Sequence, residues 1–475
     1  MLDLLKRNKL VVVLLLAILV RLAFLFLFAD TLAFDDQTEI HGSLAYDTLA
    51  TNLLQTGVYG MVPGVPDASI PPLYSYVLAL VYATVGRGFI QIALFHICLD
   101  LLSMILLYEI GRRLFREGTL WKDPIGEWVG TLAVLFYALY PYLIFQNLTL
   151  IDTAFFMLTF FAFVLSVIVL RDRQPLDKIT LLLALLSGLI LGLSTLARPI
   201  TPFFAILVAV WFLFRLSLWQ TLLRLIPVAI LSVITLIPWT IRNYEVYDAF
   251  VPMSITSGAN LWQGNSKWTV PVFKAGYDVQ WTEPEINELE SKDWKSREAD
   301  SERFALAFKY LQEHADQIPD LLLTKFLIHW SIELAPRHNP QPGQRWELSE
   351  QGDLLILNDS GDMVGLSESN TSYDSGLLND IGRPLHTLYF GSLLLLAILG
   401  FIMSIKQWRE VSLLWFVQIS MTLVYLIFHP ATRYRVPTDP LLFLFSAFTV
   451  ALALAYLLDK DHRRYSSRNH VIRPE

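Results

Sequence analysis

Apolar stretches of membrane-spanning length recur along the chain. They lie near residues 10–29, 89–110, 128–147, 152–170, 179–197, 200–216, 225–241, 385–404, 411–428 and 438–458. A helix needs about 20 residues to cross a hydrocarbon core of about 30 Å. The pattern therefore predicts an all-α polytopic membrane protein with about ten transmembrane helices.

The first polar region, residues 30–87, separates the first two apolar stretches. Leu44, Leu49 and Leu53 recur in it at helical spacing, and Gly57 follows as a C-cap. Residues 72–86 are apolar, but about 15 residues form a helix of only about 22 Å, which is too short to span. We therefore expect two short juxtamembrane helices in this first loop.

The second polar region, residues 243–384, separates the seventh and eighth stretches. Its residues 283–317 are charged and helix-prone, 320–334 form a short apolar segment, and 340–375 are rich in turn-forming residues. We expect a small mixed or irregular domain here. The chain then has three parts, which are a transmembrane module over 1–242, this outer domain over 243–384, and transmembrane helices with a tail over 385–475.

Composition supports a membrane protein. The chain is 54% hydrophobic and 17% charged, with a mean hydropathy of +0.48, whereas soluble domains carry about 25% charged residues. The net charge of −7 and the absence of a basic face predict no nucleic-acid partner. The single cysteine, Cys98, lies in an apolar stretch and is expected to be a small buried hydrophobe.

Lysine and arginine are concentrated at one set of helix ends, which predicts the orientation. That set comprises Lys6, Arg7, Lys9, Arg112, Arg113, Arg116, Lys122, Arg171, Arg173, Lys178, Arg215, Arg224, Lys406, Arg409, Lys460, Arg463, Arg464, Arg468 and Arg473. The opposite short connections carry only Arg87, Arg198, Arg433 and Arg435. Both termini are therefore expected in the cytoplasm and both polar regions outside it, in a plasma (inner) membrane. The first stretch, about 20 residues long, exceeds the core of a signal peptide and is expected to be an uncleaved span.

Acidic residues gather in the first polar region. Asp35 and Asp36 come first, and Glu39, His41 and Asp47 follow. A carboxylate beside an apolar surface has a raised pKa and can accept a proton from a hydroxyl nucleophile. The alternative is a solvated acidic loop without chemistry, which is also the simpler interpretation of Asp47 inside its helix.

Three further ionisable residues lie within or at the ends of apolar stretches. Asp152 opens the fourth stretch, either as a helix N-cap or as a site residue. Arg198 and Arg21 interrupt apolar stretches, where arginine usually faces a polar cavity or an anion. Arg21 has the alternative of snorkelling to the outer surface.

Arginines also flank the outer entrance of the last stretch. Residues 429–440, HPATRYRVPTDP, contain Arg433 and Arg435, and Arg242 lies at the corresponding end of the seventh stretch. Guanidiniums beside an aromatic ring suit a phosphate or pyrophosphate at headgroup level. Anchoring to lipid headgroups is the alternative. His429 and Tyr46 are additional candidate site residues.

Several stretches of the chain resemble a known family. They are YDTLATNLLQTGVYG with PPLYSYVLAL, LTLIDTAFF, LSTLARPITPFF, IPWTIRNYEVYDAFVPMSITSGANLWQGN and RYRVPTDPLL, in this order. In these stretches the chain resembles bacterial members of the GT-C superfamily, specifically relatives of the protein O-mannosyltransferases and the lipid A aminoarabinose transferase. The resemblance covers most of the helical part and leaves 267–382 unmatched.

The resemblance implies a glycosyltransferase that moves one sugar from a polyprenyl-phosphate donor to an acceptor protein, lipid or glycan at the outer face, with inversion. It implies a general base in the first outer loop and a second acid, matching Asp152, at the hairpin between spans three and four. Relatives place the base just before the segment matching AYDTLA, where this chain has His41-Gly42-Ser43. We therefore expect Asp36, and after it Asp35, to be the base.

The remaining implications concern the donor phosphate, a metal and other classes of function. Arg433, Arg435 and Arg198 are expected to hold the departing phosphate, and membrane lipids are expected partners. Some GT-C enzymes use a divalent metal, but no ligand set of fixed spacing appears here.

Two other functions are alternatives to a glycosyltransferase. One is a transporter or flippase for a lipid-linked saccharide, whose usual internal repeats we do not find. The other is a non-catalytic relative, which the His41-Gly42-Ser43 departure favours.

The predicted orientation has a direct test. A reporter that is active only in the cytoplasm should work when fused after Glu475 and should fail when inserted near Gly361, because the two sites are expected on opposite sides of the membrane. Equal activity at both positions would contradict the ten-span arrangement.

Overall fold

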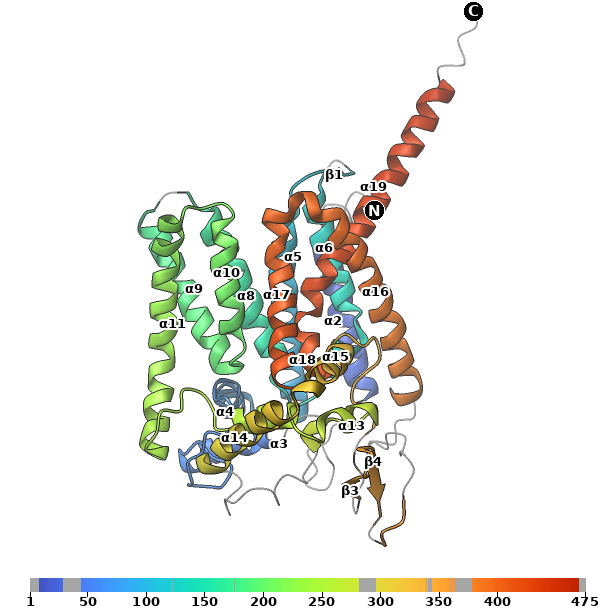
Figure 1. Cartoon of the computed structure of the whole chain (residues 1–475). Helices are drawn as coiled ribbons and strands as arrows, with labels where there is room; N and C mark the ends of the chain where they lie inside the picture. The colour runs from blue at the N-terminus through green and yellow to red at the C-terminus, as the bar shows by residue number, and fades with distance from the viewer. Residues whose placement is uncertain are drawn as a thin grey trace, which may run out of the picture.

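Long helices run side by side through the computed structural model (Figure 1), which describes residues 8–28, 44–121, 123–174, 176–281, 296–338, 340, 344–358, 360–363 and 378–469. The long helices are α2 (Lys9–Leu27), α5 (Phe89–Leu114), α8 (Thr153–Asp172), α9 (Lys178–Ala197), α11 (Leu218–Tyr247), α16 (Arg383–Met403), α17 (Trp408–Ile427) and α19 (Asp439–Asn469). Seven helical segments among the described residues are long and apolar enough to cross a membrane, and one of them, 380–427, contains both α16 and α17. The predicted all-α multi-pass membrane fold is confirmed, whereas the number of spans stays a prediction.

Two of the predicted spans are shorter than expected. The stretch 128–147 is divided into α6 (Ile125–Ala138) and α7 (Pro141–Gln146), so its prediction as one continuous helix is wrong. Pro141 has no N–H and disfavours helical backbone in the residue before it, which explains the break. The sixth stretch forms α10 (Thr201–Leu213), with 13 residues. About 13 residues rise only about 20 Å, less than the hydrocarbon thickness.

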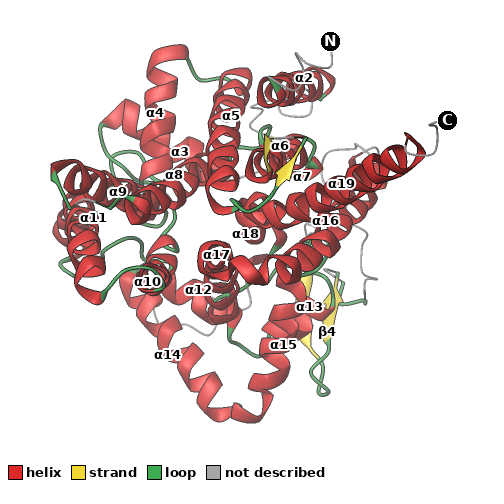
Figure 2. Cartoon of the chain, turned by 90° about the horizontal axis from the view of Figure 1, so that it is seen from above, coloured by secondary structure: helices red, strands yellow, loops and turns green. Residues whose placement is uncertain are grey.

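The shorter elements gather at one end of the bundle, which we call the loop end (Figure 1). They are α3 (Leu44–Thr56), α4 (Leu73–Val85), α12 (Ser257–Gly264), α13 (Thr269–Lys274), α14 (Arg297–Glu313), α15 (Ile318–His329), α18 (Thr432–Arg435), and the strands β3 (Arg345–Leu348) and β4 (Leu354–Leu357). The start of α2, the paired strands β1 (Thr119–Leu120) and β2 (Asp123–Pro124), and the end of α19 lie at the opposite end. Seen along the helix axes, α9 and α11 lie at one edge of the bundle, and α16 and α19 lie towards the other (Figure 2).

The structure confirms the two expected juxtamembrane helices as α3 and α4. Gly57 ends α3 with a φ of +71°, a left-handed backbone that glycine adopts without strain. Residues 243–384, which we call the outer segment after their predicted location, are mixed as expected. The described part of this segment combines α12 to α15 with the antiparallel hairpin β3–β4, in which Arg345 pairs with Leu357. The division of the chain at 242 and 384 stays a prediction.

The core lies between the long helices, and α8 is the most enclosed of them. Its phenylalanine side chains Phe156, Phe160 and Phe163 are at most 1% exposed, and the ring of Phe160 contacts that of Phe204 on α10. In contrast, Cys98 on α5 is exposed, so the expectation that it is buried is wrong. A small apolar residue suits a lipid-facing surface as well as a core, and hydropathy does not distinguish the two.

Arg21 is buried and paired inside the bundle, so the snorkelling alternative is wrong. Its guanidinium on α2 donates to the Asp100 carboxylate on α5 at 2.9 and 3.1 Å, and to the carbonyl oxygen of Ala138 at 3.0 Å. The Tyr137 hydroxyl donates to the second Asp100 oxygen at 2.8 Å. This network joins α2, α5 and α6 and satisfies a charge that would otherwise be costly at this depth.

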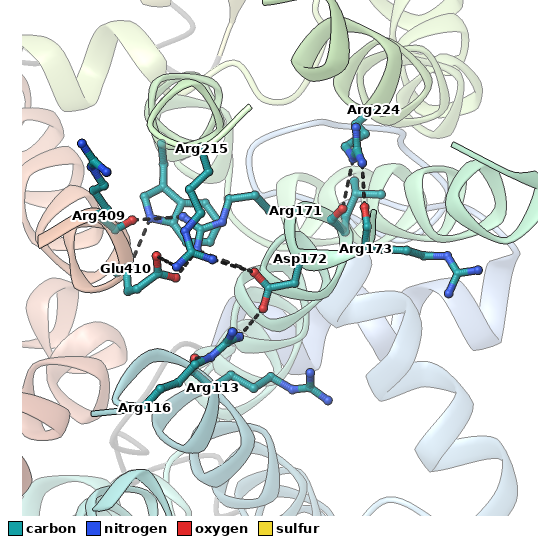
Figure 3. Close-up of polar contacts among 11 residues, drawn as sticks. Arg113, Arg116, Arg171, Asp172, Arg173, Arg215, Arg224, Arg409 and Glu410 are labelled. Carbon is teal, nitrogen blue, oxygen red and sulfur yellow. Dashed lines mark hydrogen bonds and ion pairs between the residues drawn. The ribbon is translucent and has the colours of Figure 1, made fainter. Parts of the chain in front are cut away.

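A second charge network joins helices at the end of the bundle that lies opposite the loop end (Figure 3). Arg171 at the end of α8 pairs with Glu410 on α17, and Arg215 after α10 pairs with the same carboxylate at 2.5 Å. Arg116 after α5 pairs with Asp172. These contacts fix the ends of α5, α8, α10 and α17 relative to one another.

The Arg21–Asp100 pair should contribute strongly to stability. Arg21→Met leaves the Asp100 carboxylate buried without its counter-ion, and we expect the free energy of unfolding to fall by about 3–5 kcal/mol. Unfolding in detergent, followed by circular dichroism, measures this loss. The double variant Arg21→Met/Asp100→Asn should lose less than the single variant, because no uncompensated charge remains. A single variant as stable as the wild type would contradict the prediction.

Candidate functional site

Asp152 and Arg198 form an ion pair at the loop end. Asp152 precedes α8, and Arg198 follows α9. The Arg198 Nε and Nη2 atoms donate to the two carboxylate oxygens of Asp152 at 2.6 and 2.5 Å. The Asp152 side chain makes no capping hydrogen bond, so the interpretation that it serves only as a cap is wrong. A bidentate pair of this kind is charge-assisted and fixes the orientation of both side chains.

Polar side chains from the juxtamembrane helices and from α5 lie near this pair. Tyr46 on α3 is half-buried and lies within electrostatic range of both Asp152 and Arg198, and its ring packs edge-on against Tyr74 of α4. The Tyr74 hydroxyl is 2.7 Å from Nε2 of His96 on α5. The fold therefore brings the predicted candidate Tyr46 within electrostatic range of Asp152, and α3 of the first loop contributes to this part of the molecule.

Arg433 organises the other half of the site. On α18, it pairs with Asp278 at 3.3 Å and donates to the side chain of Gln280 and the hydroxyl of Tyr434. The Tyr434 ring stacks on Tyr425 of α17, with 4.9 Å between centroids. Asp278 and Gln280 come from the outer segment, so this half depends on residues far apart in sequence.

Tyr425 connects the two halves. It lies within electrostatic range of Arg198 and Asp152 on one side and of Arg433 on the other. We call the set Arg198, Arg433, Tyr425 and Tyr434 the arginine–tyrosine cluster. It combines two guanidiniums with two aromatic rings at the loop end, which is the arrangement that suits a phosphate.

Both arginines of the cluster keep hydrogen-bonding capacity. Arg198 Nη1 and Arg433 Nε are buried and have no hydrogen-bond partner among the described residues. A buried donor without a partner costs about 1–3 kcal/mol, so such groups need an explanation. A bound anion would supply the missing acceptors.

Arg435 and Arg242, the other predicted phosphate ligands, are engaged in different ways. Arg435 is fully buried, pairs with Asp439 at 3.2 Å and donates to the carbonyl oxygen of Ser331 at 2.6 Å, although its Nη2 has no partner among the described residues. Arg242 donates to the carbonyl oxygens of Asp67 and Tyr59 at 2.6 and 2.7 Å. Both side chains therefore link loop segments to helices.

Asp47, predicted as a further candidate, is buried and lies in a structural clamp. Arg87 donates to both of its carboxylate oxygens at 2.9 and 2.7 Å, and the Tyr82 hydroxyl donates at 2.6 Å. The expectation that this carboxylate is solvated is wrong. Burial is the largest of several causes that raise the pKa of Tyr82, which keeps its hydroxyl a donor to Asp47.

The remaining predicted residues divide into two groups. The proposed bases and their neighbours, Asp35, Asp36, Glu39 and His41, lie outside the described residues. His429 lies next to the cluster, with its ring 5.5 Å from Tyr434 and its Nε2 3.2 Å from the Asn260 side-chain oxygen. Burial lowers the pKa of His429 to about 4, so this imidazole is neutral at physiological pH.

The described residues do not form a metal site. No group of three or more His, Cys, Asp or Glu side chains comes together among them. The two carboxylates at the site, Asp152 and Asp278, are paired with Arg198 and Arg433. Donors engaged by arginine do not fit a divalent ion, so we derive no step that involves one.

Sequence reasoning missed Asp278, Gln280 and Tyr425. Asp278 and Gln280 lie in the segment that matched no pattern, and each resembles any other polar residue of a loop. Tyr425 reads as one more apolar residue of its helix. No signal in the sequence distinguishes them, because only the packing of α17 against α18 and the outer segment brings them to the arginines.

Comparison with known proteins places the fold in a class. No protein-family model and no curated protein matches the chain. Solved structures do match, at 12–13% identity, and they show that this chain shares their fold.

Matching structures include oligosaccharyltransferase structures from the archaeon Archaeoglobus fulgidus, the first of which is named AglB. Its complex with an inhibitory peptide and a dolichol-phosphate aligns with a TM-score of 0.52 and 13% identity over 99% of this chain and 53% of that chain. The enzyme tethered to an acceptor peptide aligns with a TM-score of 0.53 and 12% identity over 95% and 50%. This chain thus spans about half the length of the solved proteins that it matches.

Proposed function

We propose that this protein is a membrane glycosyltransferase that transfers a sugar from a polyprenyl-phosphate donor to an acceptor at the extracytoplasmic face. The observation that carries the proposal is the arginine–tyrosine cluster, in which Arg198 and Arg433 each hold a buried nitrogen without a partner among the described residues. Dolichol-phosphate, present in a solved AglB complex, belongs to the proposed donor's chemical class. The GT-C fold supports the same reaction class.

In the proposed reaction the cluster acts on the leaving group. The lipid phosphate gains negative charge as the bond to the sugar breaks, and guanidiniums already in position stabilise that charge without reorganisation. Arg198 and Arg433 would bind the phosphate oxygens with Nη1 and Nε. Their carboxylate partners Asp152 and Asp278 hold the two guanidiniums in place.

The acceptor hydroxyl needs a base, for which we propose Asp36, with Asp35 as the second choice. The hydroxyl would attack the anomeric carbon opposite the departing phosphate, which inverts the configuration, and its proton would pass to the carboxylate. Asp47 is a poorer choice, because Arg87 and Tyr82 already bind its carboxylate oxygens. Asp152 is likewise occupied by Arg198.

The two neighbouring arginines of α18 provide a matched pair for the phosphate prediction. Arg433→Ala should weaken binding of a polyprenyl phosphate by about ten- to hundredfold, because one charge-assisted contact is lost. Arg433→Ala should also lower the unfolding temperature, because it leaves the buried Asp278 carboxylate without its arginine partner. Arg435→Ala leaves Asp439 buried without its partner in the same way, so it is the control that separates a loss of stability from a loss of lipid binding. Unchanged lipid binding in Arg433→Ala would contradict the proposed clamp.

A series of carboxylate variants tests the base. Asp36→Asn should lower transfer by roughly 10²–10⁴, the usual effect of losing a general base, and should leave donor binding nearly unchanged. Asp35→Asn should do less. Asp47→Asn should chiefly lower stability, because it weakens the clamp between α3 and α4. A fully active Asp36→Asn protein would show that the base lies elsewhere, and activity with every carboxylate replaced would exclude this mechanism.

A further inference from the structure

A lysine lies buried at the end of α17, the helix that carries Tyr425 of the arginine–tyrosine cluster. Lys325, on α15, is 0% exposed. Its ammonium donates to the side-chain oxygen of Asn265 at 2.9 Å and to the carbonyl oxygen of Leu426 at 2.9 Å. The carbonyl of Ile427 is 3.5 Å away. These carbonyls belong to the last turn of α17, where the helix leaves acceptors free and a cation is favourable.

The end of α12 also contacts the end of α17, next to Lys325. The Asn265 amide donates to the Ile427 carbonyl oxygen at 2.8 Å. The preceding Gly264 lies so close to the backbone that a Cβ there would be 1.8 Å from the Phe428 carbonyl oxygen. The end of α17 is therefore held between α12 and α15, and Lys325 supplies the charged contact.

The segment that follows α17 leads directly to the cluster. After Phe428, His429 Nε2 lies 3.2 Å from the Asn260 side-chain oxygen. The backbone is then fixed at Thr432, whose N–H donates to the Ala335 carbonyl oxygen at 3.0 Å and whose hydroxyl accepts from the Ala335 N–H at 2.8 Å. Arg433 is the next residue. The segment 428–432 is thus tied down at both ends, by Lys325 with Asn265 at the first end and by Ala335 at the second.

From this geometry we propose that Lys325 is a positioning residue for donor binding, because its ammonium fixes the end of α17 and thereby places Arg433 against the lipid phosphate. The inference rests on the proposed function, since it assumes that the cluster binds that phosphate. It also assigns a role in donor binding to a buried cation that is not among the proposed phosphate contacts.

The charge of Lys325 is available for this role and is sensitive to pH. No carboxylate pairs with it among the described residues, and burial lowers the pKa of Lys325 to about 7. The groups that face it are the α17 carbonyls, the neutral Asn265 of α12 and, on the following segment, His429. His429 is neutral above pH 6, since burial lowers its pKa to about 4, so Lys325 is the group here that changes charge near neutrality.

Binding of a labelled C55 polyprenyl phosphate to the full-length protein in nanodiscs, measured between pH 6.0 and 8.5, tests the inference. Wild-type affinity should fall as the pH rises through the pKa of Lys325. Lys325→Arg keeps the cation throughout and should bind with a smaller pH dependence. Lys325→Met should bind about tenfold more weakly at pH 6 and lack the step. The phosphate's own second pKa, about 6, is common to all variants and cancels in the comparison.

Controls separate the outcomes. Lys309→Met, an exposed lysine on α14, should match the wild type. If Lys325→Met binds like the wild type with the same pH profile while Arg433→Ala fails to bind, the inference is overturned and the proposed function stands. If the wild type and Arg433→Ala bind equally, the proposed clamp itself fails, and this is visible without any Lys325 variant. If Lys325→Met does not fold, the pH profile of Lys325→Arg decides. If Lys325 has only a structural role, Lys325→Arg should show the same pH profile of binding as the wild type, and the inference is overturned.

Discussion

The bidentate contact between Arg198 and Asp152 illustrates the constraint on which this structure depends, namely that a charge removed from water must find a partner. In a bundle surrounded by lipid, an unpaired guanidinium or carboxylate costs several kcal/mol. The chain meets the constraint repeatedly, with Arg21 on Asp100, Arg171 on Glu410 and Arg435 on Asp439. Most of these pairs join two different helices, so the charges also specify which helices are neighbours.

The arginines differ in how completely they are engaged, and Arg435 and Arg171, which join helices, also keep a buried nitrogen without a partner among the described residues. Arg21 and Arg242 have their donors directed at protein acceptors. Arg198 and Arg433 are held by carboxylates and still keep a buried nitrogen free of partners among the described residues. A guanidinium that is held by a carboxylate and keeps one nitrogen without a partner is positioned before any ligand arrives. Binding an anion then requires little further loss of side-chain conformational freedom.

Hydrophobic patterning predicted the long helices well, because an apolar run of spanning length has few other stable states. It also predicted α3 and α4, whose lengths exclude a full crossing. It failed at 128–147, where the break at Pro141 was overlooked, and at Cys98, because hydropathy does not distinguish a lipid-facing position from a core position. Patterning identifies that a residue is apolar or charged, whereas the partner of each charge depends on packing.

At the candidate site, the sequence was even less able to identify the partner of each charged residue. Asp152 and Arg198 were predicted separately, and nothing in their spacing indicated that they would bind each other. Asp47 was expected to be solvated, and only the approach of Arg87 from beyond α4 explains its burial. Asp278 had no sequence signal at all. Pair partners that lie far apart in the chain require the three-dimensional arrangement.

The outer segment consequently does more than cover the bundle. Arg198 is fixed by the transmembrane helices through Asp152, but Arg433 is fixed by Asp278 and by the end of α17, which α12 and α15 hold. The separation of the two guanidiniums is therefore set jointly by the bundle and by the outer segment. A phosphate that bridges them would draw on both, and movement of α15 alone would change the fit without disturbing any residue that contacts the ligand.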